Sequence, residues 1–120
     1  MTDYKLAEAE SKFADLIWEN EPINSTELVQ LSEGVMKWKK STTYTVLKRL
    51  CNRGIFKNEN AVISAIMSRD EFLSCQSHRF VEDTFGGSLP FFLASFISRK
   101  RLSEQQAEEL VRLINEHKEL

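Results

Sequence analysis

The sequence predicts a mainly α-helical fold with one small β-hairpin, and three observations carry this prediction. Only four Gly and two Pro occur in 120 residues, while helix-favouring Leu, Ala, Glu, Lys and Gln are common. Apolar residues recur at a helical period through most of the chain. Two short β-prone runs lie close together in residues 55–67. A chain of this length forms one domain, or a small domain with an appended subdomain.

Charge is segregated along the chain. The net charge is −2, yet no Asp or Glu occurs between Glu33 and Glu59, a stretch that holds seven Lys and Arg residues. The rest of the chain has nine basic residues and all eighteen acidic ones. A local basic patch is what a polyanion contacts, so the acidic overall balance does not exclude nucleic acid as a partner.

Two helices are predicted before the basic stretch. Residues 6–20 carry an apolar face at helical spacing, formed by Leu6, Ala9, Phe13, Leu16 and Ile17. The second helix begins after Asn24, which forms a capping box with Glu27, and continues to about Ser32. We expect the segment Ser32-Glu33-Gly34 to end it, and a turn region of seven residues to follow.

Residues 38–54 form the third predicted helix, whose two sides differ in chemistry. The apolar side carries Val46, Leu47, Leu50 and Cys51, and the opposite side carries Thr42, Thr45, Arg49 and Asn52. Short hydroxyl side chains beside long cations let a helix approach base edges while it reaches phosphates on either side. The pattern therefore favours a recognition helix. An ordinary amphipathic helix with a solvated basic face has the same periodicity.

Lys39 and Lys40 lie near the positive end of the dipole of this helix. Each is expected to cost a few tenths to about 1 kcal/mol in isolation. A phosphate bound at that end would reverse the sign, because free amide groups and cations would then act together.

A β-hairpin is predicted directly after the basic helix. Gly54 is the expected C′ glycine that ends the helix, and the hairpin turn is placed at Asn58-Glu59-Asn60. Helix, helix, turn, basic helix and hairpin is the order of a winged helix-turn-helix unit. We therefore assign residues 1–68 to a winged helix-turn-helix DNA-binding domain with a small β-wing.

Residues 69–120 are predicted to form a helical dimerisation region. Ser68 with Glu71 and Ser103 with Gln106 have the pattern of capping boxes. Residues 89–98, which start after Ser88, are apolar around most of the helix. Such a surface must be covered, and a second copy of the chain is the simplest cover, since two-fold symmetry suits a palindromic DNA site. The alternative is a monomer whose tail folds back on its own head.

An ordered set of segments gives the chain a family resemblance. The segments are Leu6-Ala7-Glu8-Ala9-Glu10 leading to Leu16-Ile17-Trp18, then Trp38, Thr42, Thr45-Val46-Leu47-Lys48-Arg49-Leu50 and Arg53-Gly54, then Ser68-Arg69-Asp70-Glu71, Gly87-Ser88-Leu89-Pro90, and Leu102-Ser103 with Glu108-Glu109-Leu110. In these segments the sequence resembles the penicillinase repressor family of winged-helix regulators, the BlaI/MecI type, over nearly its whole length.

The resemblance implies a homodimeric bacterial repressor that binds double-stranded operator DNA near its own operon or one like a β-lactam-resistance operon. Carried over by position, base contacts fall to Ser41, Thr42 and Thr45, and phosphate contacts fall to Lys39, Lys40, Lys48 and Arg49. The resemblance also implies dimerisation through the C-terminal helices, with Phe91, Phe92, Phe96, Leu110 and Ile114 as the candidate residues.

The chain departs from the family pattern at three places. Lys39-Lys40 stands where many relatives have Ser-Pro, so the operator sequence cannot be copied from them. The wing at Glu59-Asn60-Ala61 is short and includes an acid, so we expect it to add little affinity. Members switched by a membrane sensor protease are cut at an Asn-Phe bond, and the matching bond here is Ser95–Phe96. Cleavage at this bond is a hypothesis. The Cys-x-Cys cluster of the copper-responsive branch is absent from the sequence.

Other function classes have less support. His78 and His117 are isolated, and no catalytic constellation stands out, so we expect neither an enzyme nor a cofactor. Cys75 and His78 would give two metal ligands, too few for a closed structural site, and no metal is expected. No long apolar run or signal peptide pattern occurs, which predicts a cytoplasmic protein without membrane insertion. The remaining rival is a winged-helix protein–protein adaptor, which predicts no salt-dependent binding to duplex DNA.

Overall fold

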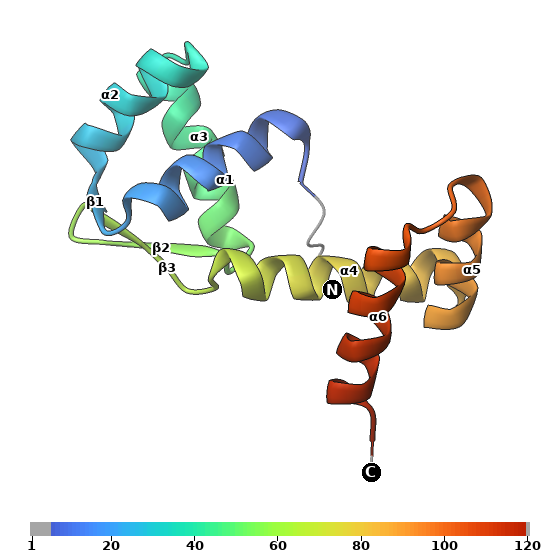
Figure 1. Ribbon diagram of the computed structural model, residues 1–120. Helices are drawn as coiled ribbons and strands as arrows, with labels where there is room; N and C mark the ends of the chain where they lie inside the picture. The colour runs from blue at the N-terminus through green and yellow to red at the C-terminus, as the bar shows by residue number, and fades with distance from the viewer. Residues whose placement is uncertain (1–5, 120) are drawn as a thin grey trace. The chain divides into compact units, whose positions relative to one another are not determined.

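The computed structural model describes residues 6–119, which form six helices and a three-stranded sheet (Figure 1). The chain divides into two compact units, the first ending at Arg79 and the second beginning at Phe80. The elements in order are α1 (Glu8–Asn20), β1 (Ile23–Asn24), α2 (Ser25–Met36), α3 (Lys40–Asn52), β2 (Phe56–Glu59), β3 (Val62–Ala65), α4 (Arg69–Phe85), α5 (Leu89–Arg99) and α6 (Glu104–His117). The predicted boundary between residues 68 and 69 falls at the start of α4, a helix that continues from the first unit into the second.

The first unit is a winged helix-turn-helix head, as predicted. Helices α1, α2 and α3 and the sheet enclose one apolar core (Figure 1). The buried apolar residues are Phe13, Ala14, Leu16, Ile17, Ile23, Leu28, Val46, Leu47, Leu50, Ile55, Phe56, Ile63 and Phe72. Trp18 and Trp38 pack at the edge of this core, Trp38 against the ring of Phe13 at 5.2 Å. The apolar face expected from periodicity in α3 is the face that the head buries. In α1, Phe13, Leu16 and Ile17 are buried as expected, but Ala9 is exposed and Ala14 is buried instead.

The helix-turn-helix differs from the prediction at the end of α2. This helix does not stop at Gly34 but continues to Met36, so the turn contains three residues, Lys37 to Lys39, instead of seven. Lys37, with a φ of 61°, makes the left-handed turn that ends the helix, not the predicted segment Ser32-Glu33-Gly34. Glycine costs only about 1 kcal/mol inside a helix, and the contact of Ser32 with α3 holds the last turns in place.

The sheet is antiparallel with strand order β1-β3-β2. The predicted hairpin is confirmed, but its turn lies at Asn60 and Ala61, not at Asn58 to Asn60. Both turn residues have positive φ, 54° and 64°, as a two-residue type I′ turn requires. Strand β1 was not predicted, because its two residues are too short for a periodic signal. It pairs with β3 through Ile23 opposite Ile63.

Local signals set most of the helix ends. Gly54, with a φ of 80°, follows α3, and the amides of Gly54 and Ile55 donate to the carbonyls of Cys51 and Leu50, the pattern of a Schellman motif. The Ser68–Glu71 capping box is present, with both reciprocal hydrogen bonds at 3.1–3.2 Å. Asn24 caps α2, but its side chain accepts from the amide of Thr26 and not from that of Glu27, as the predicted capping box requires. The predicted ends of α1 and α3 were within two residues of the observed ones.

The second unit holds the end of α4 together with α5 and α6. Ser88 caps α5, and the predicted Ser103–Gln106 capping box starts α6. Five phenylalanines form a chain of ring contacts at 5.1–6.1 Å, namely Phe80, Phe85, Phe91, Phe92 and Phe96. Despite this cluster, no residue of Leu89–Arg99 or Glu104–His117 is buried in a single chain. Within residues 6–119, no helix combines the length and apolar character needed to cross a membrane.

Candidate nucleic-acid interface

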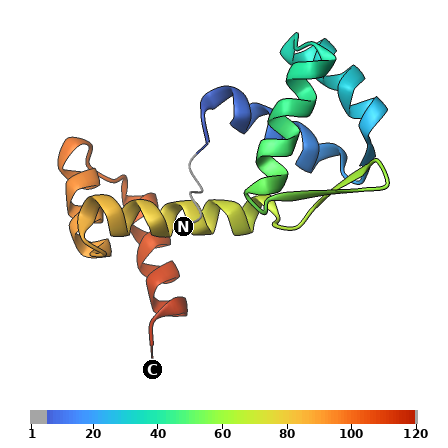
Figure 2. The same cartoon turned by 180° about the vertical axis from the view of Figure 1, so that it is seen from behind.

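Helix α3 presents a polar face because its opposite face is fixed in the core. Thr43, Val46, Leu47 and Leu50 are buried, which determines the rotation of the helix about its axis. The seven residues predicted to contact DNA are all exposed, namely Lys39, Lys40, Ser41, Thr42, Thr45, Lys48 and Arg49. The fold therefore leaves all seven exposed on α3 and at its start, and we call this set of residues the α3 face. Figure 2 shows the hairpin following directly from the end of this helix.

A buried hydroxyl pair joins the two helices of the helix-turn-helix. Thr43 Oγ1 is hydrogen-bonded to Ser32 Oγ at 2.9 Å and to the carbonyl oxygen of Lys39 at 3.2 Å. Both residues have no exposed surface. A buried hydroxyl is costly unless paired, so each residue requires the other, and the pair sets how α3 sits on α2. This pair was not predicted from the sequence, although a Thr on the apolar side of an amphipathic helix is a signal for a buried polar contact.

The orientation of Thr45 bears on how the α3 face could recognise bases. Thr45 Oγ1 donates to the carbonyl oxygen of Ser41 at 2.9 Å, one turn earlier in the helix. With its proton committed to the backbone, the exposed hydroxyl can only accept, and the methyl group stays available. An accepting oxygen suits the amino group of adenine or cytosine, and a methyl group suits the methyl of thymine.

The start of α3 has no side-chain cap. Its N-cap residue is Lys39, whose side chain cannot accept a hydrogen bond and makes no capping contact. Several amides of the first turn lack a helical partner in any α-helix. These free amides and the exposed ammonium groups of Lys39 and Lys40 together make the N-terminus of α3 suitable for binding an anion. Lys40 Nζ lies 6.0 Å from the ring centroid of Tyr44, which keeps this cation near the helix.

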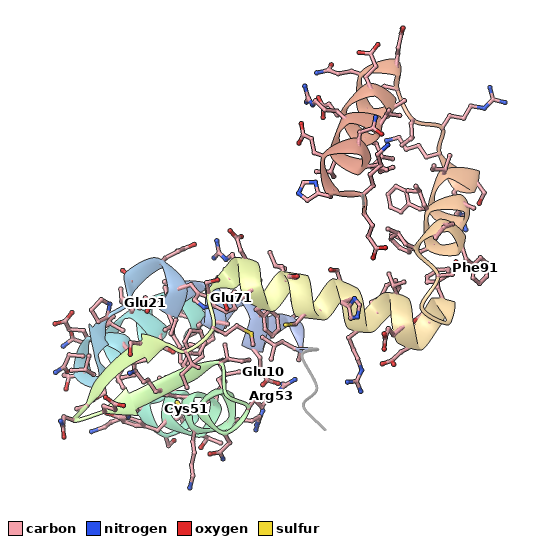
Figure 3. All side chains as sticks on the ribbon, turned by 90° about the horizontal axis from the view of Figure 1, so that it is seen from below. Glu10, Glu21, Cys51, Arg53, Glu71 and Phe91 are labelled. Carbon is pink, nitrogen blue, oxygen red and sulfur yellow. The ribbon has the colours of Figure 1, made fainter. Side chains whose placement is uncertain are left out.

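Arg49 differs from the other cations of the α3 face because an acid of α1 lies beside it. Arg49 Nη1 is 3.5 Å from Glu10 Oε1, and the Glu10 side chain is only 16% exposed. Glu10 is labelled in Figure 3. Its other carboxylate oxygen, Oε2, is buried and has no hydrogen-bond partner among the described residues. A phosphate that binds Arg49 would therefore compete with Glu10.

The wing carries little free positive charge. Lys57 in β2 pairs with Glu59 at 3.6 Å on the same strand, and both side chains are largely exposed. Asn58 and Asn60 are exposed polar residues of the hairpin. A wing with this charge balance gives few phosphate contacts.

The described part of the chain offers no metal-binding cluster. Among residues 6–119, no three His, Cys, Asp or Glu side chains come together as metal ligands. Both cysteines are free thiols, and partial burial raises the pKa of the Cys51 thiol above its ordinary value. A raised pKa leaves less thiolate at neutral pH, which fits a packing role for Cys51.

The residues proposed for dimerisation and cleavage lie in the second unit. Phe91, shown with its label in Figure 3, is 58% exposed, Phe96 is 62% exposed and Ile114 is 50% exposed. Phe92 and Leu110 are half-buried. The bond between Ser95 and Phe96 lies inside α5, and both residues are exposed.

Comparison with known proteins agrees with this architecture. The sequence pattern of the family described as penicillinase repressor matches residues 6–116. The chain is 24% identical to the penicillinase repressor of Bacillus licheniformis over 118 residues, which are 95% of this chain and 92% of that protein. It is 21% identical to the methicillin resistance regulatory protein MecI of Staphylococcus aureus (strain Mu50), over 93% of this chain and 94% of that protein. The MecI protein of Mammaliicoccus sciuri is 20% identical over the same shares. Since the family match spans nearly the whole sequence, the chain belongs to the penicillinase repressor family of transcriptional repressors.

Proposed function

We propose that this protein is a homodimeric repressor that binds a palindromic operator in double-stranded DNA, near its own operon or one like a β-lactam-resistance operon. Helix α3 enters the major groove of each half-site. Ser41, Thr42 and Thr45 contact bases, and Lys39, Lys40, Lys48 and Arg49 contact phosphates. The protein acts in the bacterial cytoplasm, where the operator is.

The single observation that carries this proposal is the composition of the α3 face. All seven of its residues are exposed, none is acidic, and the N-cap residue Lys39 gives the helix no side-chain cap. Cations alone would support non-specific contact with a polyanion. Hydroxyl side chains between the cations add groups that can read base edges. The names of the related proteins as repressor and regulatory protein support the same function.

Dimerisation is supported by the second unit. Its helices leave Phe91, Phe96 and Ile114 half or more exposed in one chain. Exposed apolar groups of this size are typical of surfaces that associate. A second copy bound through α5 and α6 would cover them and would present two α3 helices to the two halves of a palindrome.

Binding is tested by fluorescence anisotropy of the purified protein on its own upstream promoter and on a scrambled duplex, from about 50 to 200 mM salt. We expect the protein to bind the promoter at least about a thousandfold more tightly than the scrambled duplex. Replacing Lys39→Glu and Lys40→Glu together should abolish specific binding, because two phosphate-binding cations per head become repulsive. The slope of affinity against salt should fall by nearly one for each lost contact.

A matched control is Lys100→Glu with Lys118→Glu, which changes net charge equally at two exposed positions outside the head. This variant should bind the promoter like the wild type. Wild-type protein that bound neither duplex at about 50 mM salt would contradict the proposal and favour a protein–protein adaptor.

Relief of repression by a membrane sensor protease that cuts the Ser95–Phe96 bond is a further part of the proposal. Both residues are exposed on α5, and the cut would divide the surface proposed for dimerisation. Incubation with the activated cognate protease should give two fragments with ends at Ser95 and Phe96. An intact chain after this incubation would exclude the cut.

A further inference from the structure

Arg69, the first residue of α4, is held by three side chains of one face of α1. Its Nη2 lies 2.8 Å from Asp15 Oδ1 and 3.6 Å from Glu19 Oε1, and its Nε lies 3.1 Å from Asp15 Oδ1. The guanidinium carbon is 5.8 Å from the ring centroid of Trp18. We call Asp15, Trp18, Glu19 and Arg69 the Arg69 latch. All four residues belong to the first unit.

Trp18 extends the latch to the residues on both sides of the first turn of α4. Its indole N–H donates to the carbonyl oxygen of Met67 at 2.9 Å. Its ring packs against Phe72, which is buried in the head, at 5.7 Å. The Ser68–Glu71 capping box, whose Glu71 is labelled in Figure 3, fixes the backbone between them. The start of α4 is therefore held in direction as well as in position.

The ion pairs of the Arg69 latch add little to the stability of the head. The side chains of Arg69, Asp15 and Glu19 are 42–63% exposed, and ion pairs at this exposure contribute little to stability. Their geometry has a larger consequence, because α4 contains no Gly or Pro at which it could bend. Any change of angle at Arg69 is carried along the whole helix.

The size of this effect can be set against the dimensions of DNA. Helix α4 has 17 residues, which at about 1.5 Å per residue gives a length of about 25 Å. A tilt of about 10° at its start would displace its far end by about 4 Å, more than the roughly 3.4 Å rise of one base pair. If the angle of α4 at its first turn varied by this amount, the distance between the two heads of a dimer would vary by the length of a base pair or more.

We propose that Arg69 is a positioning residue that sets the half-site spacing accepted by the protein. The inference rests on the proposed dimer on a palindromic operator. Arg69 touches no DNA in this role. It holds the head and α4 at one angle, so that an operator with the matching distance between half-sites binds more tightly than one with a longer or shorter distance.

The test measures anisotropy of the full-length protein on three operator duplexes, with the natural spacing and with about two base pairs added or removed, and on an isolated half-site. The wild type should prefer the natural spacing by roughly tenfold or more, a difference of about 1.4 kcal/mol. Arg69→Met keeps an unbranched apolar stem but removes the guanidinium. It should reduce the preference to under about threefold and leave half-site binding unchanged.

Two further variants separate positioning from charge and from folding. Arg101→Met removes an exposed guanidinium in the second unit and should keep the wild-type preference. Asp15→Arg combined with Arg69→Asp exchanges the two charges and should restore much of the preference that Arg69→Asp alone loses.

Different results would contradict the role of Arg69 and the proposed function. Wild-type protein that binds none of the duplexes would contradict the function itself. Wild-type protein that binds all spacings equally, or an Arg69→Met protein that keeps the full preference, would overturn the role of Arg69 alone. Loss of half-site binding in Arg69→Met would also overturn it, because that result means a disturbed head.

Discussion

Arg49 and Glu10 show how one acidic residue can tune a basic surface. Arg49 is proposed to bind a phosphate, yet the fold already places Glu10 Oε1 at 3.5 Å from it. Glu10 cannot move far, because its side chain is 84% covered by the protein. The cost of separating the pair is therefore included in any affinity that the protein has for DNA.

Replacing Glu10→Gln should strengthen binding to DNA. The neutral side chain no longer competes with phosphate for Arg49. A partly exposed ion pair contributes about 0.2–1 kcal/mol, so affinity should rise roughly 1.4- to fivefold. The gain should be largest near 50 mM salt and should shrink toward about 200 mM, because released counterions account for it. Anisotropy titrations on promoter DNA at both salt concentrations measure this.

Glu8→Gln is the matched control for that variant. It makes the same chemical change on the same helix, at a side chain that is 88% exposed and lies 4.0 Å from Lys12. Its effect on DNA affinity should be clearly smaller. Equal gains from both substitutions would mean that only the net charge of α1 matters and that the contact with Arg49 does not.

Among the elements, the wing has a turn that its sequence does not favour. A two-residue type I′ turn needs positive φ at both positions, and Asn-Gly is the preferred pair. Asn60 tolerates this conformation, but Ala61, with a φ of 64°, does not do so readily. The turn is held by its surroundings, since Ala61 O accepts a hydrogen bond from the amide of Ser25 at 2.8 Å and β3 pairs with both other strands.

Ala61→Gly should therefore stabilise the head. A left-handed residue other than glycine costs about 1–2 kcal/mol, of which the greater backbone freedom of glycine in the unfolded chain offsets about 0.5–1 kcal/mol. The net gain of roughly 0.5–1 kcal/mol should raise Tm by about 2–6 °C in thermal unfolding followed by circular dichroism. A Tm equal to or below that of the wild type would show that the surroundings, not the residue, set the strain at this turn.

The same substitution within a strand provides the comparison. Ala65 lies in β3, is not left-handed and is partly buried. Ala65→Gly should lower the free energy of unfolding by about 0.5–1 kcal/mol, because glycine weakens a strand.

The elements also show why some features could be predicted from sequence and others could not. Helix periods, the Gly54 stop and the Ser68 and Ser103 caps are local, so residues a few positions apart were enough to predict them. The hydrogen bond between Ser32 in α2 and Thr43 in α3 joins residues eleven positions apart. Strand β1 exists only because β3 lies beside it, and the Arg69 latch joins residues 54 positions apart. No local pattern contains these contacts.

The same limit applies to the α3 face. Its exposed residues followed from the helical period, because the buried side of α3 is strongly apolar. The ion pair of Arg49 with Glu10 was not predicted, since it depends on how α1 crosses α3.

At the scale of the whole molecule, the two units have contrasting surfaces. The head has an apolar core of thirteen residues and exposes the charged α3 face. The second unit has no buried residue in α5 or α6 and exposes phenylalanine, valine, leucine and isoleucine. Removing such an apolar surface from water stabilises the protein. A second copy can do this, because a two-fold contact brings the same apolar groups together from both copies.

Ile114→Glu should convert the proposed dimer into a monomer. Ile114 is half-exposed in the single chain, so the charge should leave the fold of α6 and the circular dichroism spectrum unchanged. In a two-fold dimer the substitution occurs twice. Full burial of an isoleucine contributes about 1.5–3 kcal/mol, and about half of the Ile114 surface is still available for burial, so the loss is roughly 1.5–3 kcal/mol for the two copies. That raises the Kd of dimerisation by about ten- to a hundredfold. Sedimentation equilibrium across protein concentration measures it.

Asn115→Glu is the control for this prediction, because it adds the same charge at the neighbouring exposed position of α6 where a polar side chain already stands. It should remain dimeric. Ile114→Glu should also lose its preference for a full palindrome over a half-site, since a monomer reaches only one half-site at a time. A wild-type protein that sediments as a monomer, or an Ile114→Glu protein that stays dimeric, would contradict dimerisation through α6. These apolar residues would then have to be covered in another way.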